Sequence, residues 1–420
     1  MSSWFERARF GMFVHWGHVS QRGWELSWPL VGGLSVFPAC QDVPAATYHE
    51  SAATFCPQPQ SAREWLDLAR RAGMRYAVLT AKHHDGFALY PTRAGEFSIA
   101  ATPYRGDLVR EFVDATRAAG LRVGLYYSLS DWHHPDYPPF TDSDRPYRMG
   151  MAPRPTAAQW ERYRTFLFAQ LRELLTDYGP IDVLWFDGGW ERSVDQWDTP
   201  GLHELIRSIQ PEVLVNDRLP GFGDFDTPEQ FIPAQPPGRA WETCMTMNDS
   251  WGYNPSDTNY KSARELVHTL CEVAGRGGNL LLNVSPMGDG HLPSVQVERL
   301  AAIADWMDAY GASVLDTAPG LEPWQFYGPS TRRGNRFYLH LLQRPYDTVT
   351  VRGVPIRRVR AIRELRSGAA LPFRTRCTVL DQLLNSDPNG ELIITVPEEL
   401  LDPLATVVEV EMALSAAVQP

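Results

Sequence analysis

Asp187 ends an apolar run, IDVLWFD at residues 181–187, and is followed by two glycines and a tryptophan. A carboxylate at the end of a buried strand can act as a nucleophile, and the tryptophans beside it offer flat apolar surface for the C–H face of a sugar. A lone Asp after a strand is more often a turn or helix-capping residue. The chemistry therefore depends on what other side chains the fold brings to the same place.

Four other apolar runs also turn polar or aromatic at their carboxyl ends. They lie at residues 13–17, 78–86, 124–128 and 214–218. In a barrel of parallel strands the active site is built from residues at these strand ends. The recurrence predicts that Asp187 belongs to a site shared by several strands.

Segments with helical periodicity separate these strands. Three of them end at a glycine directly before a strand, at residues 61–73, 107–120 and 156–179. In the first, Ser61 is a plausible cap with Glu64 at the reciprocal position. Later segments fit a strand, a helix, a strand and a helix at residues 213–217, 260–275, 279–284 and 294–310.

This alternation predicts parallel strands joined by right-handed crossovers, in a (β/α)8-like (TIM-type) barrel over residues 1–318. Residues 220–260 look loop-rich. A doubly wound open sheet is the alternative, but no glycine-rich nucleotide-binding loop follows the early strands.

The pattern changes beyond residue 319, where short alternating or β-branched runs are separated by Gly, Pro, Asn and Asp. The runs lie at residues 336–342, 348–351, 358–362, 391–396 and 406–411. They predict a C-terminal antiparallel β-sandwich domain over residues 319–420.

Composition narrows the classes of partner. The 420 residues carry 39 Lys and Arg against 50 Asp and Glu, a formal charge of −11, with no basic stripe for a phosphate backbone. No apolar stretch approaches the ~20 residues that span a bilayer. We therefore expect neither nucleic acid nor membrane as a partner. The sequence gives no oligomeric state.

The five cysteines are widely spaced and lack the paired spacing of a zinc site, so free thiols are expected. The N-terminus has no basic flank, apolar core or small-residue cleavage site of a signal peptide. Both features favour the cytoplasm. A chain whose signal peptide had been removed would look the same and would belong to the periplasm or the outside of the cell.

Together these motifs resemble the α-L-fucosidases of glycoside hydrolase family 29. The resemblance covers roughly residues 4–290, and the motifs occur in the order of the family. They are FGMFVHWG at 10–17, TAKHHDGF at 80–87, GLYYS at 124–128, LWFDG at 184–188, NDR at 216–218, GDFDTPEQ at 223–230, WETCM at 241–245, WGY at 251–253 and GGNLLLNV at 277–284.

The resemblance implies a retaining exo-glycosidase that cleaves terminal α-L-fucosyl linkages through a covalent glycosyl-enzyme intermediate, with Asp187 as nucleophile. It implies no metal and no cofactor. Glu229 is the expected acid/base, because many members carry theirs on this loop. Glu242 is the second candidate, and a purely supporting role for its carboxylate is an equal alternative.

The substrate implied is a fucosylated oligosaccharide or glycoconjugate. His15, His83, His84 and Arg218 match sugar-binding positions of the family. Trp185 and Trp28 are expected to supply apolar surface, and Tyr127 is expected near the nucleophile.

One motif departs from the family pattern. Many members have a Glu directly before a Trp in the loop after residue 17, whereas this chain has Ser27 before Trp28. Glu25 is expected to take the sugar-binding role through a shifted loop. The reaction type is thus better defined than the preference for fucose over a related sugar.

Two other classes of function compete with this interpretation. Residues 83–85 and 133–136 carry His and Asp that would suit a metallohydrolase, but no established ligand spacing is present. A non-catalytic carbohydrate-binding protein on the same scaffold would be expected to lack a catalytic carboxylate, yet Asp187 and Glu229 are both there.

Overall fold

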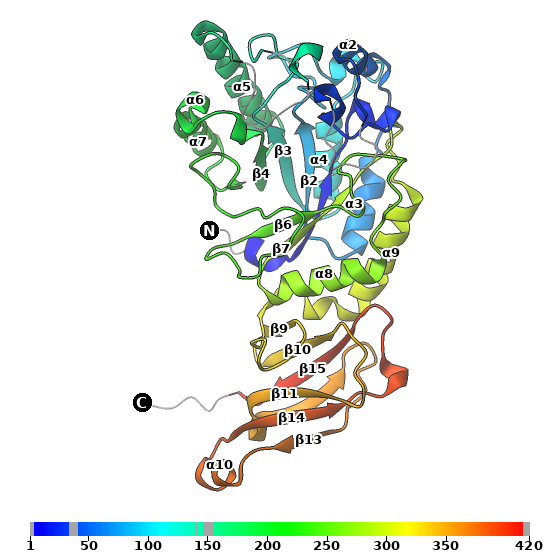
Figure 1. The fold of residues 1–420 in the computed structure, drawn as a ribbon, viewed down its shortest axis with the longest axis vertical. Coiled ribbons are helices and arrows are strands. Elements are labelled where there is room, and N and C mark those ends of the chain that lie inside the picture. Colours follow the sequence, from blue (N-terminus) through cyan, green and yellow to red (C-terminus); the bar gives the residue numbers. More distant parts are fainter. Residues whose placement is uncertain (1–3, 33–40, 139–140, 146–153, 415–420) are drawn as a thin grey trace.

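The structure, a computed structural model, describes residues 4–32, 41–138, 141–145 and 154–414. Figure 1 shows an α/β part that carries the N-terminus and a β part below it that carries the C-terminal strands. The α/β part contains a curled parallel sheet with the strand order β5-β4-β3-β2-β1-β7-β6. Its strands are β1 (Phe10–Val14), β2 (Tyr76–Lys82), β3 (Arg122–Ser128), β4 (Val183–Asp187), β5 (Leu214–Val215), β6 (Glu242–Met245) and β7 (Asn279–Val284).

An irregular extended segment at residues 224–230 fills the remaining gap between β5 and β6. It forms parallel bridges from Phe225 to Asn216 beside β5 and from Glu229 to Cys244 in β6. The amide of Asp217 donates to the carbonyl of Phe225 at 3.0 Å. The amide of Glu242 donates to the carbonyl of Asp226 at 2.9 Å. This segment closes the ring, which confirms the barrel-like fold class, but β6 lies in a stretch where the sequence indicated only loops.

Helices cover the outside of the sheet (Figure 1). The longer ones are α3 (Ala62–Arg71), α4 (Leu108–Ala118), α5 (Ala157–Asp177), α7 (Thr199–Ile209), α8 (Ala263–Gly275) and α9 (Ser294–Tyr310). Shorter ones are α1 (Phe5–Ala8), α2 (Ala45–Glu50) and α6 (Val194–Trp197).

Helix capping differs from the prediction in one case. Thr156 and Gln159 form a reciprocal capping box at the start of α5. Ser61 makes no side-chain cap on α3, because its hydroxyl donates instead to the carbonyl of Gln58 at 2.7 Å. The helix begins where predicted, but the expected cap is wrong.

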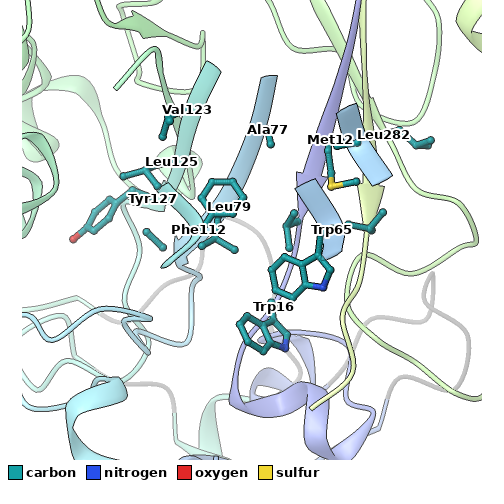
Figure 2. Close-up of a cluster of buried hydrophobic side chains, with 14 of the residues drawn as sticks. Met12, Trp16, Trp65, Ala77, Leu79, Phe112, Val123, Leu125, Tyr127 and Leu282 are labelled. Carbon is teal, nitrogen blue, oxygen red and sulfur yellow. The ribbon is translucent and has the colours of Figure 1, made fainter. Parts of the chain in front are cut away.

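Alternate residues of each strand face opposite sides of the sheet. Phe13, Tyr76, Tyr126 and Trp185 belong to one buried cluster inside the ring. Their neighbours in sequence form a larger cluster between strands and helices, part of which Figure 2 shows with Met12, Ala77, Leu79, Leu125 and Tyr127 labelled. The parity of a residue in its strand therefore decides whether it can reach the inside of the barrel.

The C-terminal strands form two antiparallel sheets, ordered β12-β15-β10-β9-β8 and β11-β14-β13, around a shared apolar core. The strands are β8 (Ala318–Pro319), β9 (Ser330–Arg333), β10 (Arg336–Leu341), β11 (Thr348–Pro355), β12 (Val359–Glu364), β13 (Phe373–Arg376), β14 (Asn389–Thr395) and β15 (Thr406–Met412), and a short helix, α10 (Val379–Leu384), precedes β14. The predicted sandwich is confirmed, and β8, β9 and β13 are strands that the sequence did not indicate.

Helices α8 and α9 join the two parts. The indole nitrogen of Trp306 in α9 donates to the carbonyl of Ala405 at 2.8 Å. The ring of His268 in α8 lies 2.8 Å from the carbonyl of Leu404. Within the described ranges, none of the helices combines the length and apolar character needed to cross a membrane.

The inner core leaves no room at Gly11 in β1. A methyl group added there would come within 2.5 Å of the Tyr76 ring. We expect Gly11→Ala to lower the free energy of unfolding by roughly 1–3 kcal/mol, because overpacking a full core displaces side chains or backbone. Urea unfolding followed by circular dichroism measures this, with Gly238→Ala as the control, since a methyl group there would meet nothing within 4 Å. Equal stability of the two variants would contradict this view of the core.

Candidate active site

A pocket of about 240 Å³ lies at the carboxyl ends of the barrel strands. Its volume is below the range of about 300–1,000 Å³ that is usual for drug-sized ligands, so it suits one small ring. The lining residues are Phe13, His15, Leu26, Trp28, His83, His84, Tyr126, Trp185, Asp187, Trp190, Arg218, Glu229, Cys244 and Trp251.

Asp187 is the last residue of β4 and is held by two donors on its two oxygens. The hydroxyl of Tyr126 in β3 donates to Oδ2 at 3.0 Å. Nη1 of Arg218 donates to Oδ1 at 3.1 Å. These two contacts fix the orientation of the carboxylate at the end of β4.

Arg218 links the two carboxyl groups that the sequence proposed for catalysis. Its Nη2 donates to Oε2 of Glu229 at 2.6 Å while Nη1 contacts Asp187. The guanidinium lies over the Trp185 ring, 4.6 Å from its centroid. Burial alone would lower the pKa of Arg218, but the charges of Asp187 and Glu229 outweigh burial and hold the pKa above its ordinary value.

Glu229 reaches the pocket from the irregular segment that closes the barrel. Its side chain is 39% exposed, against 12% for Asp187. It can therefore meet both the pocket and the solvent, as a residue that exchanges protons with water must.

Glu242, the second candidate acid/base, lies beneath the floor and does not line the pocket. The indole nitrogen of Trp185 donates to Oε1 at 3.1 Å, and the hydroxyl of Tyr76 donates to Oε2. Burial raises the pKa of Glu242 to about 7. This placement favours the supporting role that the sequence left open, because both oxygens are occupied by residues of the barrel interior.

The three predicted histidines line the pocket and are fixed through their Nδ1 atoms. His15 Nδ1 lies 2.7 Å from the side-chain oxygen of Asn283, and His84 Nδ1 lies 2.7 Å from the hydroxyl of Ser128. The Ser128 hydroxyl donates to the carbonyl of Ser130. His15 and His84 therefore carry their proton on Nδ1, which leaves Nε2 of His15 to accept a hydrogen bond from a hydroxyl group. Nε2 of His84 faces Oδ2 of Asp187 at 3.7 Å.

Burial lowers the pKa of each of these histidines to about 3. Nearby imidazoles contribute further to this shift for His15 and His83. All three rings are therefore neutral near pH 7, which suits hydrogen bonds to the uncharged hydroxyl groups of a sugar.

The chain is similar to known proteins in both sequence and structure. A family model described as alpha-L-fucosidase matches residues 1–312. Tissue alpha-L-fucosidase of Macaca fascicularis is 30% identical over 429 residues, which cover 95% of this chain and 85% of that protein.

The solved structure of alpha-L-fucosidase isoenzyme 1 from Paenibacillus thiaminolyticus is 34% identical, with a TM-score of 0.85 and coverage of 98% of both chains. The Thermotoga maritima alpha-fucosidase, solved with a mechanism-based inhibitor, is 30% identical, with a TM-score of 0.76 and coverage of 97% and 96%. The chain belongs to the α-L-fucosidase family. The family that the sequence motifs indicated is thereby confirmed, and with it a glycoside hydrolase class for the protein.

The expected position of one site residue of this α-L-fucosidase, Tyr127, was wrong. Tyr127 does not line the pocket, and its hydroxyl donates to Gln170 on α5 at 2.7 Å. Tyr126, its neighbour in β3, contacts Asp187 instead. The prediction chose the wrong face of the strand: β3 and β4 pair with Ser128 opposite Asp187, so Tyr126 shares the face of the nucleophile.

Glu25 is also not where sugar binding would need it. Its carboxylate is buried outside the pocket lining and accepts from the backbone amides of Trp251 at 2.7 Å and Gly252 at 2.9 Å. Burial raises the pKa of Glu25 to about 8 despite these two donors. The loop is not shifted to replace the usual Glu, and Glu25 instead fixes the pocket wall at Trp251.

Ser27 takes a different role in the same loop. Its hydroxyl lies 2.6 Å from Nδ1 of His83 and accepts from the amide of Asp85 at 2.9 Å. The pocket wall on this side consists of Leu26 and Trp28, with the Trp28 ring edge-on to His84 at 5.7 Å.

Several fucosidase pocket residues were not identified from the sequence. Tyr126 and Trp251 lie in the motifs at residues 124–128 and 251–253, and Trp190 follows the two glycines after Asp187, but none of them was named as a site residue. Tyr126 and Tyr127 point to opposite faces of β3, and only the register of β3 against β4 shows which of them shares the face of Asp187. Trp190 and Trp251 lie in loops, where no periodicity indicates which way a side chain points.

The residues of the metallohydrolase alternative do not converge. The His133 ring stacks on Phe97 at 3.9 Å, and Asp136 pairs with Arg162. Within the described part of the chain, no group of three or more His, Cys, Asp or Glu side chains is arranged to hold a metal ion. The described cysteines Cys56, Cys244, Cys271 and Cys377 are free thiols, and Cys40 lies outside the described residues.

The neutral histidines give a testable pH dependence. His15 has a pKa of about 3 here against the ordinary 6.5, so between these values the unfolded chain binds more protons and stability rises with pH. We expect His15→Asn to reduce the slope of unfolding free energy between pH 5 and 6.5 by up to about 1.4 kcal/mol per pH unit. Urea unfolding at several pH values measures this slope. His291→Asn, at an exposed position, is the control, and a wild-type slope in His15→Asn would show that the buried ring is charged.

Proposed function

We propose that this member of the α-L-fucosidase family removes terminal α-L-fucosyl groups from fucosylated oligosaccharides or glycoconjugates with retention of configuration. The observation that carries the proposal is the single guanidinium of Arg218 that contacts both Asp187 and Glu229. Two carboxyl groups at one small pocket are what a two-step displacement at an anomeric carbon requires.

In the first step Asp187 attacks the anomeric carbon, and the bond from that carbon to the leaving oxygen breaks. Glu229 gives its proton to this oxygen, so the products are a glycosyl-enzyme ester and a free alcohol. In the second step Glu229 takes a proton from water, which attacks the same carbon and releases Asp187. Two inversions give net retention.

Arg218 contacts the nucleophile and the acid/base at the same time. A substrate whose leaving oxygen lies at Glu229 would compete with the guanidinium for that carboxyl group. Glu229 would then contact the leaving oxygen in place of the guanidinium.

The shape of the pocket supports cleavage at a chain end. His84, Tyr126 and Trp185 are each 1% exposed at its inner wall. One ring can enter, and further sugars must remain outside. The neutral histidines and the tryptophan surfaces suit an uncharged ring with hydroxyl groups and a methyl group.

Replacement of Asp187 tests the covalent step. We expect Asp187→Ala to lower kcat on p-nitrophenyl α-L-fucoside by at least about 10³-fold, because no other group can form the ester. Added azide should restore release of nitrophenol and give β-fucosyl azide, since a small anion then enters on the face of the missing carboxylate. Wild-type turnover in this variant, or azide product of α configuration, would refute the assignment.

Glu229 and Glu242 are separated by their dependence on the leaving group. We expect Glu229→Ala to reduce kcat/KM on fucosyl disaccharides by roughly 10²–10⁴-fold and on p-nitrophenyl fucoside far less, because only the poor leaving group needs a proton. Glu242→Gln, which keeps the shape of a neutral carboxyl group, should affect both substrates equally. Hydrolysis of the two substrates by each variant measures this. The reverse pattern would make Glu242 the acid/base.

EDTA added to the wild type tests the metallohydrolase alternative, and activity that survives it removes that alternative. A folded wild type that hydrolyses no fucoside would favour a carbohydrate-binding protein or a glycosidase for a related sugar.

A further inference from the structure

Trp190 stands at the rim of the pocket. It is 37% exposed, whereas His84 beside it is 1% exposed. Its ring meets the His84 ring edge-on, with centroids 5.3 Å apart. Glu229, with a side chain that is 39% exposed, also lies at the rim. The pocket thus has buried inner walls and an exposed edge that carries one aromatic ring and one carboxyl group.

The turn that carries Trp190 is held on both sides. The carbonyl of Gly189 accepts from the indole nitrogen of Trp197 at 2.9 Å. The buried carboxylate of Glu191 accepts from the indole nitrogen of Trp132 at 3.0 Å and from the hydroxyl of Tyr137. Trp190 therefore projects from a short 3₁₀ turn, Gly189–Glu191, whose other two residues are fixed.

This turn also packs tightly against the loop that carries Arg218. A methyl group added to Gly189 would come within 2.7 Å of the carbonyl oxygen of Arg218. The turn follows the nucleophile directly, so the position of Trp190 is tied to that of Asp187. A large ring on a rigid support binds a partner with little loss of conformational entropy.

The position of the proton donor defines where the leaving group begins. If Glu229 protonates the leaving oxygen, as the proposed function requires, the group attached to that oxygen starts at the rim and extends outward. The exposed ring at the same rim is Trp190. An indole face suits the C–H face of a pyranose ring, which is apolar and flat.

We propose that Trp190 binds the leaving group by stacking on it, and that this leaving group is a sugar ring. This inference rests on the proposed function and deepens it. It makes Trp190 a residue that determines specificity for fucose attached to another sugar, separate from the residues that hold the fucosyl ring.

The test compares two substrates that share the fucosyl group. α-L-Fucosyl fluoride has no ring on the leaving side, and the fucosyl disaccharide is the one that the wild type cleaves fastest among the α-1,2, α-1,3, α-1,4 and α-1,6 linkages. In Trp190→Ala we expect kcat/KM for the disaccharide, divided by kcat/KM for the fluoride, to fall roughly tenfold, as for the loss of one aromatic contact. Trp190→Phe should restore part of this ratio.

Trp324→Ala is the matched control, because Trp324 is 63% exposed and belongs to the C-terminal part. Its ratio should equal that of the wild type. An equal loss on both substrates in Trp190→Ala would overturn the proposal, because Trp190 would then only support His84. A wild type that hydrolyses the fluoride but none of the disaccharides would overturn it as well. Failure to hydrolyse either substrate would instead refute the proposed function itself.

Discussion

The contact of one guanidinium with two carboxyl groups is the constraint on which the site depends. Arg218 follows β5, Asp187 ends β4 and Glu229 lies in the segment that closes the barrel. Two buried or half-buried negative charges would repel each other without a cation between them. The barrel must therefore bring three separate strand ends within reach of a single side chain.

The interior of the barrel is built to hold that side chain in place. Arg218 lies over Trp185, Trp185 donates to Glu242, and Glu242 accepts from Tyr76. Each residue of this series comes from a different strand or strand end. A buried carboxyl group with both oxygens occupied is costly to disturb, so the series fixes the floor beneath the two reactive carboxyl groups.

The walls above this floor combine neutral imidazoles with aromatic rings. Hydrogen bonds with Asn283, Ser27 and Ser128 set the orientation of the three histidines. The rings are neutral because burial opposes their charge. Among the described residues that line the pocket, Arg218 is the one cationic side chain, and its guanidinium contacts the two carboxyl groups.

The sequence by itself determined the barrel, the sandwich and the candidate carboxylates. Helical segments that end at glycine before apolar strands are local patterns, and they predicted α3, β2, α4, β3, α5 and β4 in order, whereas α7 and β6 were not predicted. The family motifs named Asp187, Glu229, Arg218 and the three histidines as candidate site residues, and all of them line the pocket.

Only the tertiary structure decided which face, partner and depth each residue has. Tyr126 and Tyr127 are indistinguishable in sequence, and the pairing of β3 with β4 selects Tyr126. Glu25 and Glu242 carry the same carboxyl group as Glu229. The carboxylate of Glu25 accepts from the backbone amides of Trp251 and Gly252, and that of Glu242 accepts from the Trp185 indole on the floor of the pocket. These outcomes depend on contacts between segments far apart in the chain, which local periodicity does not encode.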